Sequence, residues 1–142
     1  MATRQDFSDE EWAALQRGLT GSGMLVSLSD RDFTDSFGEA SALGKFLAGQ
    51  QVAGATDFVR EVAKTKGTGF GLTTKPDTVR TETMDALRAS VALLQAKFPD
   101  EVEPYRTLVL GLSDAVANAK GGGTSEIEGS AIGQIREALG AA

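Results

Sequence analysis

The sequence predicts an all-α fold, a compact bundle of about six helices that forms a single domain over residues 1–142. Apolar residues recur at helical spacing along most of the chain. The Ser-x-x-Glu pattern that begins many helices occurs three times. No segment shows the strict alternation of apolar and polar residues, flanked by turn signals, that a strand pair needs. With 142 residues, of which 41% are hydrophobic, the chain can bury one core but hardly two.

The first helix is predicted to begin at Ser8. Ser8 and Glu11 have the spacing of a capping box, in which each side chain accepts a hydrogen bond from the backbone N–H of the other residue. Phe7 and Trp12 occupy the two positions of a hydrophobic staple. The apolar stripe of this helix consists of Trp12, Leu15, Leu19 and Val26.

Three glycines, Gly18, Gly21 and Gly23, follow within the same segment. Each would cost about 1 kcal/mol relative to alanine inside a helix. They either break the helix or let a neighbouring helix approach closely, and the sequence leaves both readings open.

The second helix is predicted to begin at another capping box, Ser36 to Glu39, and to stop at Gly49. One of its faces carries Ala40, Leu43 and Leu47. A short third helix is predicted from a second apolar stripe, which consists of Val52, Ala55, Val59 and Val62. Residues of about 65–76 then have the glycine-rich composition of a connector.

The fourth helix is predicted to open at Pro76 or Asp77, because proline is tolerated in a first helical turn. Its stripe consists of Val79, Leu87, Val91, Leu94 and Phe98. Pro99 and Asp100 end this helix and begin the fifth. The stripe of the fifth helix consists of Tyr105, Leu108, Val109, Leu112 and Val116.

A run of glycines at 121–123 terminates the fifth helix, and the sixth begins at a third capping box, Ser125 to Glu128. Ser36 and Ser125 stand 89 residues apart, and the match between the segments they open extends ten residues past each serine. We therefore expect two pseudo-symmetric helical halves, of about 7–64 and 77–140, each of which buries a face of the other.

At these residues the chain resembles the TerB family, an all-helical module named for tellurite resistance. The resemblance is carried by Val116 to Gly122 followed by Glu128 and, more loosely, by Leu25 to Asp30 followed by Glu39. It implies two similar helical halves, a role in stress responses around membrane-associated complexes, and divalent cations bound by turn carboxylates. Lys120 stands where the family motif has an acidic residue, which disfavours a two-sided metal site.

Four carboxylates lie within ten residues, and they are the candidate metal ligands: Asp30, Asp32, Asp35 and Glu39. Ca²⁺ and other hard divalent cations are held by several such oxygen ligands. The spacing is not that of an EF-hand loop, which has a central glycine and a later glutamate. The alternative is a solvated turn whose acids cap the following helix. Glu39 and its counterpart Glu128 are likewise explained by their positions in capping boxes.

A glycine-rich stretch from Lys66 to Leu72 has the composition of a phosphate-binding loop. No strand precedes it and no Gly-Lys-Ser/Thr follows, so a connector between the halves is the better interpretation.

Composition excludes several classes of function. The chain has no His and no Cys, which excludes a Ser-His-Asp triad, a cysteine nucleophile, a disulfide framework and a His-ligated zinc site. The net charge of −6 opposes binding to nucleic acid. No apolar run approaches the ~18 residues of a membrane span and no signal peptide is recognisable, so membrane insertion is not expected and a cytoplasmic location is.

The leading hypothesis is a non-enzymatic TerB-like module that binds a protein partner without a cofactor, either as a monomer or as a homo-oligomer. A divalent-cation-binding protein that uses the turn from Asp30 to Glu39 is the first alternative. A small enzyme that relies on carboxylate, hydroxyl or lysine chemistry is the second.

A thermal melt followed by circular dichroism separates the first two hypotheses. A cation at ~100 times its dissociation constant adds ~2.7 kcal/mol of stability, which raises the melting temperature by several degrees. The cation hypothesis predicts this rise with millimolar Ca²⁺ or Mg²⁺, and its loss in the variant Asp30→Asn. Identical melts with cation and with chelator would instead assign the acids to capping and solvation.

Overall fold

The computed structural model describes residues 2–29, 36–65, 75–118 and 126–140. These ranges form six α-helices and two short 3₁₀ segments and contain no strand, which confirms the all-α prediction. The helices are α1 (Asp9–Ser29), α2 (Ser36–Ala53), α3 (Asp57–Val62), α4 (Pro76–Lys97), α5 (Val102–Ala117) and α6 (Glu126–Ala138). The 3₁₀ segments are η1 (Arg4–Asp6) and η3 (Pro99–Glu101).

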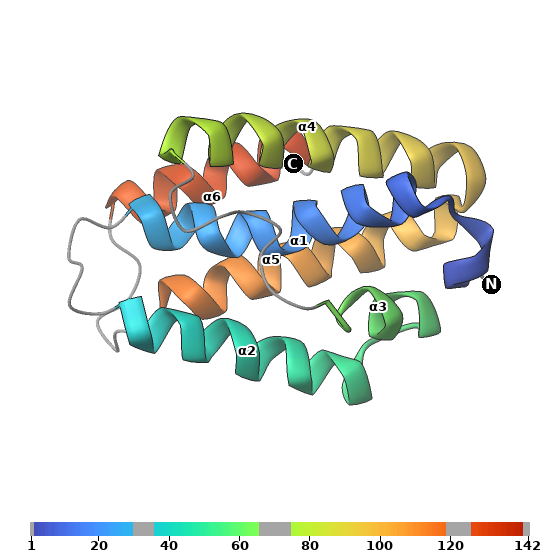
Figure 1. The fold of residues 1–142 in the computed structure, drawn as a ribbon, viewed down its shortest axis with the longest axis horizontal. Helices are drawn as coiled ribbons and strands as arrows, with labels where there is room; N and C mark the ends of the chain where they lie inside the picture. Colours follow the sequence, from blue (N-terminus) through green and yellow to red (C-terminus); the bar gives the residue numbers. More distant parts are fainter. Residues whose placement is uncertain (1, 30–35, 66–74, 119–125, 141–142) are drawn as a thin grey trace.

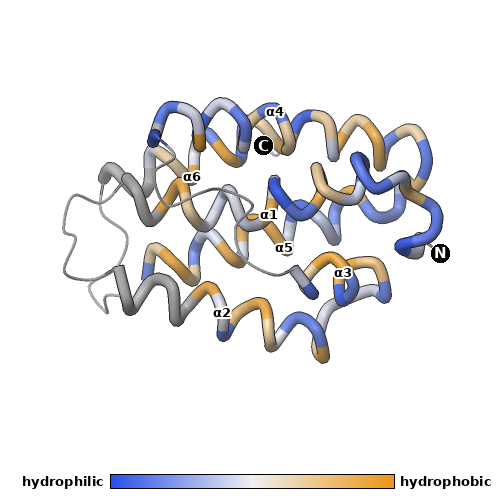
Figure 2. Tube along the Cα trace, in the orientation of Figure 1, coloured by the Kyte–Doolittle hydropathy of each residue, from blue (hydrophilic) through white to orange (hydrophobic). Residues whose placement is uncertain are grey.

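Helix α1 runs through the middle of the bundle (Figure 1). It packs against α4 over much of its length and also against α5 and α6. Helix α2 lies on the opposite side, where it packs against α5 and α3. Along the described helices apolar residues are interspersed with hydrophilic ones (Figure 2), and the buried apolar residues gather in a single cluster. One continuous core results, and an aromatic cluster at one end of it consists of Phe7, Trp12, Phe58, Phe98 and Tyr105.

The first helix begins as predicted. Glu11 N donates to Ser8 Oγ at 3.1 Å, and Ser8 N donates to Glu11 Oε1 at 2.8 Å. The hydrogen bond from the Ser8 backbone is the main reason why the pKa of Glu11 lies below its ordinary value, and Lys97 lowers it further. The rings of Phe7 and Trp12 lie 5.7 Å apart, which confirms the staple.

The glycines of α1 serve close packing and do not break the helix, which is continuous from Asp9 to Ser29. A Cβ atom on Gly18 would lie 2.7 Å from Tyr105 Oη, and one on Gly23 would lie 2.9 Å from Leu43 Cδ1. A Cβ on Gly21 would overlap with Thr83 Oγ1 of α4. Gly18 also faces Leu87 of α4, and Gly23 also faces Leu112 of α5, so the three glycines together let α2, α4 and α5 approach α1 closely.

Hydroxyl side chains line the same contacts of α1 without disturbing the helix. Ser22 Oγ donates to the carbonyl of Gly18 at 2.6 Å, one turn earlier. Tyr105 of α5 is fully buried, and its phenol donates to the carbonyl of Leu15 at 2.8 Å. This bond ties α5 to α1 next to Gly18.

Two details of the predicted helix boundaries are wrong. Gly49 does not stop the second helix, because α2 continues to Ala53. No atom lies near the Cβ position of Gly49, so a glycine on this open face costs only its helix propensity. Val52 does not belong to a third helix with Ala55, since it lies in the last turn of α2 and is 83% exposed. Helix α3 begins only at Asp57, after Thr56 has capped it by accepting from Val59 N at 3.1 Å.

The predicted boundaries of α4 agree with the structure, whereas α5 ends at Ala117, before the glycines 121–123 that the sequence predicts as its end and that lie outside the described residues. Pro76 is the first residue of α4, and Phe98 and Pro99 separate α4 from α5. The two predicted halves also contact each other crosswise, since α2 packs on α5 and α6 packs on α1. Capping boxes are also predicted at the starts of α2 and α6. Ser125 lies outside the described residues, and the side chains of Ser36, Glu39 and Glu128 are not described either. The repeat therefore stays a prediction.

Within the described residues no helix combines the length and the apolar character that a membrane span requires.

The close contact of α1 and α4 can be tested with Gly21→Ala. Overpacking against Thr83 outweighs the gain in helix propensity, so we expect the free energy of unfolding in urea to fall by about 1–3 kcal/mol. Gly49→Ala is the matched control, because its Cβ meets nothing within 4 Å, and it should raise stability by up to about 1 kcal/mol. The double variant Gly21→Ala/Thr83→Ala should recover part of the loss. A stabilising Gly21→Ala would contradict the packing described above.

Burial of Tyr105 makes stability depend on pH in the alkaline range. Burial raises the pKa of its phenol far above the ordinary value of 10.0. Above about pH 10 the unfolded chain loses a proton that the native chain keeps, so stability must fall as pH rises, by up to about 1.4 kcal/mol per pH unit. Tyr105→Phe removes this contribution.

Urea unfolding of both proteins between about pH 8 and 11.5 measures the difference. Because Tyr105 is the single tyrosine of the chain, absorbance at alkaline pH reports its ionisation directly. Equal slopes of stability against pH, or ionisation of the native protein near pH 10, would contradict the buried phenol.

Candidate functional site

The predicted cation ligands fall outside the part of the chain that the structure describes. Asp30, Asp32 and Asp35 belong to the range 30–35 between α1 and α2. Glu39 lies in the first turn of α2, but its side chain is not among those described. The glycine-rich stretch from Lys66 is also outside. The cation hypothesis therefore stays a prediction.

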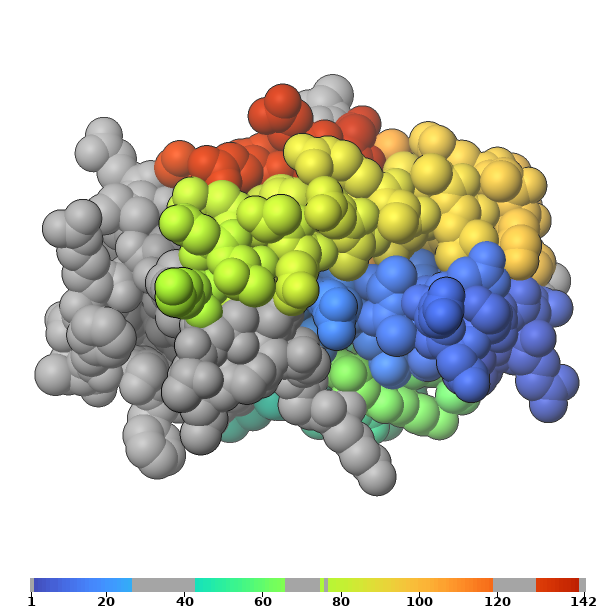
Figure 3. All heavy atoms as spheres, turned by 45° about the horizontal axis from the view of Figure 1, so that its top comes forward, coloured from blue at the N-terminus to red at the C-terminus, as the bar shows by residue number. Residues whose placement is uncertain are grey.

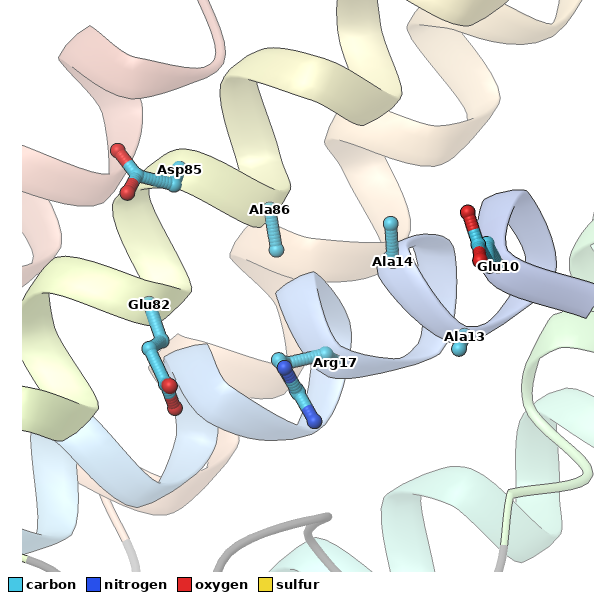
Figure 4. Close-up of a pocket in the computed structure, with 7 residues that line it drawn as sticks. All are labelled: Glu10, Ala13, Ala14, Arg17, Glu82, Asp85 and Ala86. Atoms are coloured by element: carbon cyan, nitrogen blue, oxygen red, sulfur yellow. The ribbon is translucent and has the colours of Figure 1, made fainter.

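A hollow with a volume of about 440 Å³ lies between α1 and α4. We call it the α1/α4 groove. It opens to solvent along the contact of the two helices, and Figure 4 shows the side chains that line it. They are Glu10, Ala13, Ala14, Arg17, Glu82, Asp85 and Ala86. In the space-filling view the two helices lie side by side on one face of the molecule (Figure 3).

Three alanines form the apolar part of the groove. Ala13 and Ala14 come from α1, and Ala86 of α4 faces them (Figure 4). Ala86 is 7% exposed, whereas Ala13 is exposed, so the apolar surface runs from the helix contact out to solvent. Alanine side chains leave room over the joint between the helices, which is why a hollow forms there.

Charged side chains flank this apolar strip on both helices. Glu10 and Arg17 stand on α1, and Glu82 and Asp85 stand on α4. The groove therefore carries three carboxylates and one guanidinium, a net charge of −2. Asp85 also has a loose ion pair on its own helix, in which Arg88 Nη1 lies 3.8 Å from Asp85 Oδ1, and both side chains are well exposed. Such an exposed pair contributes little to stability.

The carboxylates of the groove flank it and do not converge. In the described residues no three acidic side chains lie close enough together to hold a metal ion. In Figure 4 Glu82 and Glu10 lie towards opposite ends of the groove, with Arg17 between them on α1. This spread suits an extended partner with several positive charges better than a single ion.

No sequence pattern predicts the α1/α4 groove. Glu82 and Asp85 are three residues apart on the polar face of α4, and Glu10 and Arg17 lie on the polar face of α1. Each pattern alone is typical of a solvated helix face. The signal that was available is the pair Ala13-Ala14 on an otherwise charged face, but only the packing of α1 against α4 brings it next to Ala86.

No family model, no curated protein and no solved structure matches this chain. The resemblance to the TerB family therefore stays a prediction, and the function must be argued from the residues themselves.

Proposed function

We propose that this protein is a non-enzymatic helical module that binds a protein partner, and that the α1/α4 groove receives a basic helical segment of that partner. The proposal is carried by one observation, the strip of alanines at the joint of two helices with three carboxylates and one guanidinium around it.

The shape of the groove supports a helix as the occupant. Helices pack by laying a ridge of side chains into a groove, at distances between axes of 8–10 Å that depend on the size of the contact residues. A strip made only of alanine side chains allows the shortest of these distances. An incoming helix with small apolar residues on one face would bury the strip and lie along both α1 and α4.

The charges support a basic occupant. A net charge of −2 in the groove, within a chain of net charge −6, favours lysine and arginine side chains at the edges of the contact. Such edge charges guide association and select partners more than they add affinity. A second copy of this chain would set like charges against each other if it paired through the same groove, so the groove favours a different protein.

The sequence alternatives stand beside this proposal. The TerB resemblance would place the partner in a stress response, but its motif residues lie at the turns and helix starts and none lines the groove. Cation binding by the turn from Asp30 to Glu39 involves other residues and is compatible with partner binding.

A binding experiment with a designed peptide tests the proposal. The probe is a fluorescent helical peptide of alanine and lysine, with the lysines flanking an alanine face, and its twin carries glutamate in place of lysine. We expect the basic peptide to bind and the acidic twin not to bind. Amide resonances of residues 10–17 and 82–86 should shift saturably in a titration followed by NMR.

Matched charge variants separate the groove from general attraction to an acidic protein. The triple variant Glu10→Gln/Glu82→Gln/Asp85→Asn should weaken binding about tenfold, which corresponds to about 1.4 kcal/mol. The control Asp100→Asn/Asp114→Asn/Glu137→Gln changes the net charge equally at exposed sites outside the groove, and it should leave binding nearly unchanged. Equal weakening by both triples, or shifts on α2 or α5 instead, would overturn the proposal. Concentration-dependent shifts of α1 and α4 without peptide would identify a second copy as the occupant and overturn it too.

A further inference from the structure

A second hollow, separate from the α1/α4 groove, holds a buried carboxylate. Its volume is about 200 Å³, and it lies where the start of the chain, the start of α3 and the 3₁₀ segment η3 meet. Its lining residues are Ala2, Ala55, Thr56, Asp57, Phe58, Arg60 and Glu101. We call it the Glu101 cavity.

The carboxylate of Glu101 is buried, and the hydrogen bonds it accepts from the described residues replace only part of its lost hydration. The residue is only 9% exposed, and its Oε2 atom accepts a hydrogen bond of 2.8 Å from the hydroxyl of Thr56. The Thr56 hydroxyl has a single proton, which it donates to Glu101, and its oxygen accepts a hydrogen bond from Val59 N. No described residue forms an ion pair with Glu101. A single neutral donor offsets only part of the cost of removing a carboxylate from water.

Among the described residues Arg60 is the one cationic side chain that lines the Glu101 cavity, and its guanidinium is engaged elsewhere. It pairs with Asp57, and its Nη1 atom donates to the carbonyl of Gly54 at 2.7 Å. Asp57 thus neutralises the charge of Arg60, and no described lining residue neutralises the charge of Glu101. The cavity carries a net charge of −1.

We infer that the Glu101 cavity binds a small primary amine in its ammonium form. An ammonium group has three donors and no acceptor, which matches a carboxylate whose one partner among the described residues is a hydroxyl. Ala2, Ala55 and the largely buried Phe58 supply apolar wall for a short alkyl chain. The volume of 200 Å³ accommodates several heavy atoms beside the carboxylate, since a water molecule takes about 30 Å³ in the liquid.

A metal ion fits the cavity less well than an ammonium group. Only Glu101 and Asp57 contribute carboxylates, and Asp57 is held by Arg60. Hard cations such as Ca²⁺ take six or more oxygen ligands. The inference does not depend on the α1/α4 groove, because the two hollows share no lining residue.

The same carboxylate also ties α3 to the start of α5, and the test separates this structural role from binding. In Glu101→Gln the side-chain oxygen can still accept from Thr56, while the charge is lost. Asp100→Asn is the matched control, because it removes an equal charge from the neighbouring, exposed residue outside the cavity. Ala55→Leu is a second variant that fills the cavity and keeps the carboxylate.

The experiment is an NMR titration of the full chain with ethylammonium chloride, against sodium chloride at the same ionic strength. Amides of residues 54–60 and 100–103 should shift saturably with ethylammonium only. Glu101→Gln and Ala55→Leu should each weaken this binding at least about tenfold, and Asp100→Asn should not change it. Equal, unsaturable shifts with both salts would overturn the inference, as would undiminished binding in the two cavity variants.

A second titration, with N-acetyl-lysine amide, identifies the source of the ammonium group. Saturation with ethylammonium alone supports a free small amine as the ligand. Saturation with both probes, and tighter with the lysine derivative, supports a lysine side chain of a partner protein. Failure of the peptide experiment on the groove would leave both of these results unaffected.

Discussion

The close approach of α1 to α4 is the contact on which the rest of the structure depends. Thr83 of α4 leaves no space for a side chain at position 21 of α1. Gly18 and Gly23 let α5 and α2 approach α1 from other sides. Because α1 also packs on α6, a shift of α1 would disturb most of the core. The α1/α4 groove is the outer edge of this contact, since Ala14 and Ala86 continue the series of small residues towards solvent.

Small residues and hydroxyls lie where α1 meets its neighbours, among the larger apolar side chains of the core. The hydroxyl of Ser22 donates a hydrogen bond within its own helix, and the phenol of Tyr105 donates one to the carbonyl of Leu15. Both polar groups are therefore buried with their hydrogen bonds made, at little cost in free energy. The hydroxyl of Thr83 has no hydrogen-bond partner in the described structure and is held against Gly21 by packing alone. A larger side chain at these positions would force the neighbouring helix or its side chains to shift.

The sequence predicted what is decided locally. Ser8 and Glu11 determine where α1 begins, and Pro76 and Pro99 bound α4, because capping and proline geometry need only neighbouring residues. Gly49 misled the prediction, since a glycine ends a helix only where the chain must turn. The pairing of α1 with α4 joins residues more than sixty positions apart, and alanines carry no pattern that identifies a partner helix. The groove and the Glu101 cavity could therefore not be predicted before the fold was known.

Native-state hydrogen exchange tests the central role of α1 most directly. If α1 is the helix on which the others pack, its amides from Leu15 to Thr20 should exchange only through global unfolding, with an opening free energy equal to that from urea denaturation. Amides of α2, which packs mainly on α5 and α3, should open at lower free energy. Exchange of the α1 amides by local opening, while those of α2 stay protected to the global limit, would contradict this account.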